Sequence, residues 1–339
     1  MLVPTLSLVV AAACVTPPQG IAPPETDSVT VRRQERMSTY VTVSVAAPES
    51  PATLAAIDAA FAELDRLEAL LSEWKDASDI SNLNRHAGQG PVKVSPELFE
   101  VLQFAYDAGV ASDGAFDVTV QSLAGLWDFR WQTPKIPSVT DLEARLTLVG
   151  FRLLTLDKEA QTVAIANPAT RVGVSGLAKG YVADRMSAVL TARGFPNHLV
   201  RCGGDIYGSG RKKSGRWTIG IRDPFATGIY ATVEIENEGI STSGNYERFF
   251  IRDGVRYHHI LDPKTGRPTT GLASATVIAK RALFTDSWDT ATFVLGKERG
   301  LAAATRLGFD VLFIDEAHGT ASTPGMAKRI TVAPPDEAQ

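Results

Sequence analysis

The chain has 339 residues, enough for one large domain or two small ones with a substantial hydrophobic core. Its 34 basic and 38 acidic residues give a net charge of −4, with no long run of one sign. This balance argues against a nucleic-acid-binding groove and against a polybasic membrane patch. The two cysteines, Cys14 and Cys202, are too few for a disulfide framework.

The N-terminus has the composition of a secretion signal. A short apolar run, residues 6–13, ends in three alanines directly before Cys14, and it is too short to span a bilayer. Because Ala-Ala-Cys after such a run resembles a bacterial lipobox, we expect a signal peptide over residues 1–14 with a lipidated Cys14. Residues 15–30 would be a flexible tether and residues 31–333 the folded domain.

This interpretation implies a lipoprotein of the bacterial cell envelope, anchored to the inner membrane through Cys14 and facing the periplasm. The residues before Leu6 contain no Lys or Arg, whereas a signal peptide usually begins with basic residues. A disordered apolar N-terminus is therefore the alternative interpretation.

The N-terminal half of the domain shows one strand pattern and three helix patterns. Residues 40–45 alternate with period two and predict a strand, and apolar residues spaced by three and four predict an amphipathic helix over 51–74. Ser95 and Pro96 have the N-cap and first-turn arrangement of a helix that runs towards residue 108. A third helix is predicted over 177–193, ended by Gly194.

The C-terminal half mixes strands and helices without strict alternation. Strands are predicted at 217–221, 230–235, 273–279 and 311–314, with a helix at about 284–295 and a further helix through Leu307. Several strands are expected to pair as hairpins. The pattern predicts an α+β fold with mixed, largely antiparallel sheets and packed helices.

A polar segment between these strands is the most informative part of the chain. Asp253-Gly254 separates two apolar runs, a strong hairpin pattern, and the hairpin would return Tyr246 and Glu247 alongside His259. An Asp-Pro-Lys-Thr-Gly turn follows at residues 262–266. This density of polar residues on one hairpin indicates a functional site.

The same segment resembles the ApbE family of FAD:protein FMN transferases. Residues 242–246, Thr-Ser-Gly-Asn-Tyr, and residues 259–266, His-Ile-Leu-Asp-Pro-Lys-Thr-Gly, match the characteristic block of that family. The resemblance extends through several separated motifs from Met37 to Gly296, and it implies a T-fold-like α+β domain.

A candidate metal site lies on the helix predicted after residue 279. Asp286 and Thr290 are four residues apart and Asp289 is three from Asp286, so all three share a helix face. Carboxylate and hydroxyl oxygens are hard ligands of the kind Mg²⁺ takes, although acids near a helix N-terminus can also simply stabilise the helix dipole. The family resemblance implies the metal site, with the backbone carbonyl of Gly176 as a further ligand.

A glycine-rich turn over residues 173–180 leads into the predicted helix. Such a turn offers backbone N–H groups, and Lys179 adds a positive charge, a combination that suits a pyrophosphate. Without other evidence the pattern marks only a tight turn; the resemblance implies that Lys179 binds FAD. Gly173 departs from the family, whose members usually have an Asp contacting the flavin nucleotide there, so this contact is in doubt.

The remaining cofactor-binding candidates come from separate segments. Ala115, Phe116 and Asp117 form a loop in which a flat aromatic ring lies beside an acceptor for ribose or adenine donors, though a β-turn with a core Phe is the alternative. The resemblance implies that this loop contacts FAD, and that Met37, Trp74 and Ile260 pack on flavin or adenine. A Gly-Gly-Asp turn ending at Asp205 also matches the family and is expected to support the pocket.

These motifs together predict Mg²⁺-dependent transfer of FMN from FAD to a Thr or Ser hydroxyl of a partner flavoprotein, with release of AMP. His259 is the candidate to accept the hydroxyl proton, because an imidazole can titrate near neutral pH. The alternatives are Mg²⁺-dependent hydrolysis of FAD to FMN and AMP, and a non-catalytic FAD-binding lipoprotein.

The acceptor is expected to be a separate protein. The resemblance implies an acceptor loop of the type Asp/Ser-Gly-Ala-Thr/Ser, and the chain contains no clear copy of it. Residues 112–115 read Ser-Asp-Gly-Ala, but the following residue is Phe116, which has no hydroxyl.

Overall fold

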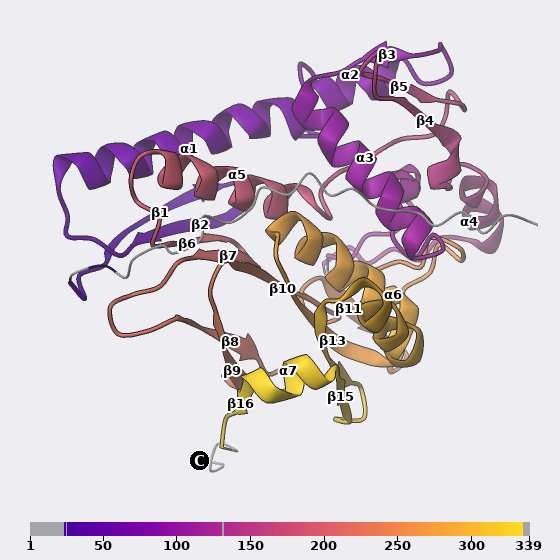
Figure 1. Cartoon of the computed structure of the whole chain (residues 1–339). Helices are drawn as coiled ribbons and strands as arrows, with labels where there is room; N and C mark the ends of the chain where they lie inside the picture. Colours follow the sequence, from indigo (N-terminus) through magenta and orange to yellow (C-terminus); the bar gives the residue numbers. More distant parts are fainter. Residues whose placement is uncertain (1–23, 25, 131, 335–339) are drawn as a thin grey trace, which may run out of the picture.

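The computed structural model describes residues 24, 26–130 and 132–334, so Cys14, the predicted signal peptide and most of the predicted tether lie outside the described residues. The domain is built on an eight-stranded, fully antiparallel sheet in the order β1-β2-β6-β7-β10-β13-β14-β15 (Figure 1). The strands are β1 (Thr30–Arg36), β2 (Thr39–Val45), β6 (His198–Cys202), β7 (Asp205–Ser209), β10 (Glu238–Gly244), β13 (Leu272–Ala279), β14 (Asp310–Asp315) and β15 (Thr320–Ser322).

Helices cover one face of this sheet. α5 (Ala178–Ala192) packs on β6 and β7, α6 (Ala282–Leu307) packs on β10 and β13, and α1 (Pro51–Leu71) lies against α5, as Figure 1 shows. The apolar positions of α1, from Ile57 to Leu71, are buried in the main core with those of α5. Burial of these helix stripes is therefore what holds α5 and α6 on the sheet.

The other face of the sheet is covered by a smaller β layer. β8 (Trp217–Arg222), β9 (Ile229–Ile235) and β16 (Ile330–Val332) form a three-stranded antiparallel sheet, next to α7 (Pro324–Arg329). Their inward side chains form a second core with Ile206, Ile240 and Ile278 of the large sheet. The large sheet is thus buried on both faces.

The remaining elements lie outside these layers. They are α2 (Asp79–Arg85), α3 (Pro96–Ala111), α4 (Val139–Leu146), two 3₁₀ turns, η1 (Val118–Leu123) and η2 (Phe151–Leu153), a small sheet of β3 (Val92–Lys93), β4 (Leu154–Asp157) and β5 (Thr162–Ile165), and the hairpin β11 (Phe249–Arg252) and β12 (Val255–His258). A third core joins η1 and α4 to this hairpin through Trp127, Leu142 and Tyr257.

The α+β prediction with largely antiparallel sheets is confirmed. The Asp253-Gly254 hairpin forms with positive φ at both turn residues, 53° and 74°, the conformation that this dipeptide favours. The two helices predicted from residue 284 to residue 307 lie within α6, which has one non-helical residue, Gly296 with φ 76°. The predicted helix over 51–74 was too long: α1 ends at Leu71, because Ser72 is extended, and Trp74 lies beyond it.

Within the described part of the chain, no helix combines the length and the apolar character that crossing a bilayer requires.

Candidate functional site

The close packing of α5 on α6 creates the centre of the site. The Gly180 amide donates a hydrogen bond to Asp286 Oδ2 at 2.8 Å, and a Cβ at Gly180 would overlap the Ala282 carbonyl. Asp184, one turn later on α5, accepts hydrogen bonds from the Ala282 and Leu283 amides at 2.7 and 3.2 Å. Asp184 therefore satisfies the free N–H groups at the start of α6, and this fixes how Asp286 faces α5.

Lys179 lies among three carboxylates. Its Nζ is 2.5 Å from Asp205 Oδ2 and 3.8 Å from Asp286 Oδ1. Burial opposes the charge of Lys179, but the negative charges of Asp205, Asp286 and Asp289 outweigh that effect and raise its pKa. Lys179 is therefore a permanent cation at neutral pH, at the position where the sequence analysis expected it to meet a pyrophosphate.

Hydroxyl groups of β10 connect the carboxylates of β7 and α6. The Ser241 hydroxyl lies 2.7 Å from Asp289 Oδ2 and also contacts Asp205 Oδ1. Two residues further along β10, Ser243 Oγ lies 3.1 Å from Thr290 Oγ1. Alternation along the strand places both serines on the α6 side.

The donor set fits a hard divalent cation. Burial, followed by the charge of Asp205, raises the pKa of Asp286 to about 7, and burial followed by the charge of Asp286 raises that of Asp289. Ionising all three buried carboxylates beside one ammonium would leave an excess of negative charge, which a divalent cation would offset. Among the described residues, no group of three or more His, Cys, Asp or Glu side chains could hold a metal ion. A cation would also need hydroxyl, carbonyl, phosphate or water oxygens.

The structure brings the predicted metal residues Asp286, Asp289 and Thr290 together on α6, with Lys179 beside them. Gly176 lies three residues before Lys179 at the entrance to α5, and its role as a carbonyl ligand stays a prediction. The sequence motifs do not include Ser241, and they indicate Asp205 only as support for the pocket. The Gly-Gly-Asp turn was the one sequence feature that pointed to Asp205, whereas Ser241 is recognisable only through its strand neighbours.

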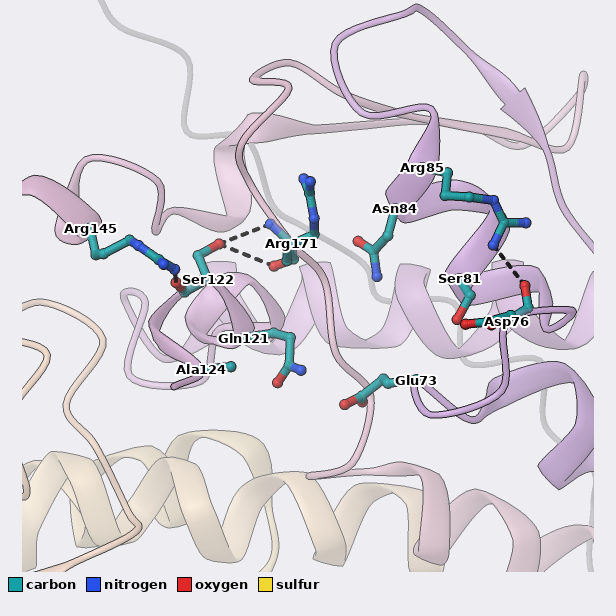
Figure 2. Close-up of a pocket in the computed structure, with 10 residues that line it drawn as sticks. All are labelled: Glu73, Asp76, Ser81, Asn84, Arg85, Gln121, Ser122, Ala124, Arg145 and Arg171. Atoms are coloured by element: carbon teal, nitrogen blue, oxygen red, sulfur yellow. Dashed lines mark hydrogen bonds between the residues drawn. The ribbon is translucent and has the colours of Figure 1, made fainter. Parts of the chain in front are cut away.

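Two amides of the glycine-rich turn before α5 already have a partner within the protein, and binding of a pyrophosphate by this turn stays a prediction. The Val174 and Ser175 amides donate to Glu73 Oε1 at 2.5 and 3.0 Å. Figure 2 shows Glu73 and Gln121 as neighbours in a pocket of about 560 Å³. Burial raises the pKa of Glu73, and the two backbone hydrogen bonds oppose that shift.

The loop at residues 115–117 lies against this turn. The Gly173 amide donates to the Val118 carbonyl at 2.9 Å, and a Cβ on Gly176 would be 3.7 Å from the Phe116 ring. Both Asp117 carboxylate oxygens accept hydrogen bonds within the protein. Oδ1 accepts from the Thr119 amide and hydroxyl, and Oδ2 accepts from the Phe151 amide. The Asp117 side chain caps η1, and its contact with FAD stays a prediction, as do those of Ala115 and Phe116, which are buried.

Met37, Trp74 and Ile260 occupy different environments. Met37 is in the turn between β1 and β2 with φ 50° and packs against the main core, where Ile260 is buried. Trp74 is 86% exposed and lines a groove of about 1120 Å³ with the aromatic residues Trp127, Phe129, Phe249 and Phe250. Because Trp74 has little packing of its own, its ring is available to a flat ligand.

The hairpin brings His259 towards the site. The His259 amide donates to the Arg248 carbonyl at 3.1 Å, which returns the chain beside Tyr246 and Glu247 as expected. The Glu247 side chain instead pairs with Arg222 at 3.3 Å. His259 is exposed to solvent, but neighbouring protein atoms crowd its ring. This crowding is the largest of the causes that lower the pKa of His259 to about 4, and the charge of Arg248 and smaller effects that include Lys179 add to it. His259 is thus a neutral ring that can accept a proton.

The turn after His259 is attached to the loop before η1. Lys264 Nζ lies 2.6 Å from Asp113 Oδ2, and Trp127 Nε1 donates to the Gly266 carbonyl at 2.9 Å. The two predicted loops, at residues 112–117 and 259–266, are therefore neighbours in the fold.

Comparison with known proteins identifies the family of the chain. The sequence profile described as the ApbE family matches residues 37–313. The chain belongs to the ApbE family. Among relatives of this ApbE-family protein, FAD:protein FMN transferase of Klebsiella pneumoniae (strain 342) is 35% identical over 258 residues, covering 75% of this chain and 80% of the relative. FAD:protein FMN transferase of Treponema pallidum (strain Nichols) is 34% identical over 296 residues, 82% of each chain.

Solved structures of the family have the same fold. The ApbE protein of Thermotoga maritima matches with a TM-score of 0.82 at 29% identity, covering 89% of this chain and 99% of that one. The Pseudomonas stutzeri flavinyl transferase ApbE, in its apo form, matches with a TM-score of 0.78 at 32% identity, covering 89% and 96%.

Proposed function

We propose that this ApbE-family protein is an enzyme that transfers FMN from FAD to a Thr or Ser hydroxyl of a partner protein and releases AMP. The observation that supports this most directly is the buried cluster of Lys179, Asp205, Asp286 and Asp289 at the entrance to α5, in a chain whose curated relatives are named FAD:protein FMN transferase. Cationic and metal-ligating groups of this kind suit a diphosphate substrate.

The reaction forms one bond and breaks one. The acceptor hydroxyl oxygen attacks the FMN-side phosphorus, the bond from that phosphorus to the bridging oxygen breaks, and AMP leaves with the bonding electrons. His259, neutral because its pKa is lowered, accepts the hydroxyl proton. The Lys179 ammonium offsets the phosphate charge, and the fixed positions of α5 and α6 orient the substrate.

Asp286, Asp289, Thr290 and the Gly176 carbonyl are the proposed Mg²⁺ ligands. When bound, Mg²⁺ would neutralise charge on the two phosphates. Because these carboxylates are buried and poorly solvated, ionising them without a nearby cation is costly. A bound cation would offset that cost.

The test is incubation of the protein with FAD, Mg²⁺ and a flavoprotein subunit that contains an Asp/Ser-Gly-Ala-Thr/Ser loop. A fluorescent, covalently labelled subunit together with AMP is the expected result. AMP and free FMN without labelling would indicate FAD hydrolysis, and FAD binding without AMP would indicate a non-catalytic flavin-binding protein.

The proposed location is the periplasmic face of a bacterial inner membrane, through a lipid on Cys14. The apolar run and the Ala-Ala-Cys sequence before a Pro-rich segment support it. The mature protein should then fractionate with membranes, and Cys14→Ser should abolish the lipid modification. Recovery of the wild-type protein unlipidated in the cytoplasm would exclude this location without affecting the proposed chemistry.

A further inference from the structure

Glu73 connects two segments of the site that lie far apart in the sequence. It follows α1 directly before Trp74, and its Oε1 accepts both the Val174 and the Ser175 amide. Within the described residues, its second oxygen, Oε2, has no hydrogen-bond partner. One oxygen of the carboxylate therefore holds the turn, and the other is free to accept.

Glu73 and Gly173 are sterically matched. A Cβ at Gly173 would lie 2.9 Å from Glu73 Oε1 and 3.0 Å from Gln121 Cβ, closer than side-chain carbons normally approach. The carboxylate of Glu73 thus lies in the space that a side chain at position 173 would need. An acidic side chain can be present at one of the two positions, but not comfortably at both.

The position of Glu73 indicates which kind of group would meet Oε2. Glu73 lines the pocket of about 560 Å³ with Gln121, Ser81 and Arg171 (Figure 2). Its neighbour Trp74 lines the larger aromatic groove. The turn that Glu73 holds continues into Gly176 and Lys179. A polar pocket suits the sugar or base edge of a nucleotide, and the aromatic groove suits a flat apolar ring.

We propose that Glu73 is a nucleotide-binding residue, whose Oε2 accepts a hydrogen bond from a ribose hydroxyl or the adenine amine of the AMP half of FAD. A carboxylate at position 173 would occupy the same space as that of Glu73, because a Cβ at Gly173 would lie 2.9 Å from Glu73 Oε1. Carboxylates bind ribose hydroxyls in this way in other nucleotide sites, and the inference rests on the proposed function because it takes FAD as the ligand.

The test measures binding of FAD and ADP to the full chain by calorimetry, with thermal unfolding of each variant. Glu73→Gln keeps an oxygen for the two amides but replaces the second oxygen with an NH₂ group. We expect an unchanged melting temperature and roughly tenfold weaker binding, because one hydrogen bond to a charged acceptor is lost. Glu143→Gln is the matched control, since Glu143 is an exposed residue of α4 that lines neither this pocket nor the aromatic groove, and it should bind normally.

Three nucleotide analogues identify the donor. 2′-Deoxy-ADP and 3′-deoxy-ADP each lack one ribose hydroxyl, and IDP lacks the adenine amine. The loss of affinity caused by Glu73→Gln should vanish with the analogue that lacks the group bonded to Oε2. An equal loss with all three analogues, or no loss with ADP, would overturn the proposal.

The pairing with Gly173 gives a second, independent test. Gly173→Asp should lower the melting temperature and weaken ADP binding in the wild-type background, but it should restore binding in a Glu73→Ala background. Equal effects in both backgrounds would contradict the inference. A wild-type protein that binds neither FAD nor ADP would instead refute the proposed function.

Discussion

The Gly180 amide donates a 2.8 Å hydrogen bond to Asp286 Oδ2, at a point where α5 and α6 are too close for any side chain at position 180. This one contact determines both helix packing and the orientation of a candidate metal ligand. Stability and site geometry are therefore coupled at Gly180.

Gly180→Ala should destabilise the protein by about 2 kcal/mol or more, because the added methyl group overlaps the Ala282 carbonyl and forces the helices apart. Chemical unfolding measures the change. Gly204→Ala is the control, since a Cβ there meets no atom within 4 Å and should cost little. Similar losses for the two variants would show that backbone flexibility, and not helix contact, explains the result.

Asp286→Ala should abolish FMN transfer while unfolding stays cooperative, and Asp289→Ala should reduce it less. The reason is that Asp286 faces the Lys179 ammonium directly and accepts a hydrogen bond from the Gly180 amide in the first turn of α5. Asp289 instead accepts a hydrogen bond from the Ser241 hydroxyl. Turnover assays and Mg²⁺ titrations check both variants. Equal and mild losses would mean that these acids only stabilise the helix and that a metal binds elsewhere.

Ser241→Ala should weaken Mg²⁺ binding several-fold, because the hydroxyl that separates and orients Asp205 and Asp289 is lost. Thr242→Val removes a hydroxyl from the same strand on the opposite side, where it contacts Thr276, and should bind Mg²⁺ normally. Affinity is measured by calorimetry on the purified protein. Normal binding by the Ser241 variant would limit this residue to a packing role.

His259→Ala should lower the transfer rate by about 10²-fold or more while FAD affinity changes little, because the proton acceptor is removed. At saturating Mg²⁺, which would keep Asp286 ionised, the wild-type rate should persist below pH 6 instead of falling near the ordinary histidine value, because the pKa of His259 is lowered to about 4. A pH profile of kcat/KM provides the measurement. An acidic limb at about 6.5 would argue against a neutral, crowded His259 as the base.

His198 should make the fold less stable in acid. Its ring is fully buried, its Nδ1 and Nε2 each lie 2.7 Å from a partner, the Phe195 carbonyl and the Ser187 hydroxyl, and burial lowers its pKa to about 4. As the pH falls below about 6.5, His198 becomes protonated in the unfolded chain while it stays neutral in the folded protein. Stability is therefore lost between about pH 6.5 and pH 4, by up to about 3 kcal/mol.

Denaturant unfolding at pH 7, 5.5 and 4.5 tests this effect, with His198→Gln as the comparison. The variant should be less stable at pH 7 but should lose less stability on acidification than the wild type. Parallel pH dependence in the two proteins would mean that other groups cause the acid sensitivity.

Local sequence was sufficient for several elements of the fold. The period of three and four in residues 54–71 identified α1, and Asp253-Gly254 identified the β11–β12 hairpin, because both depend on contacts within a few residues. The same holds for the acids of α6, whose spacing places them on one helix face. The end of α1 was predicted three residues too late, because Trp74 continues the spacing of three from Leu71 although the chain is already extended at Ser72.

The sequence by itself determined which residue types could serve a metal and a nucleotide, and the family motifs gave their order. Only the tertiary structure decided the partners that orient them. Ser241 meets Asp289 across 48 residues, and Glu73 meets Val174 across 101. Such contacts depend on which strands and loops become neighbours when the core forms, and periodicity within one segment contains no information about that pairing.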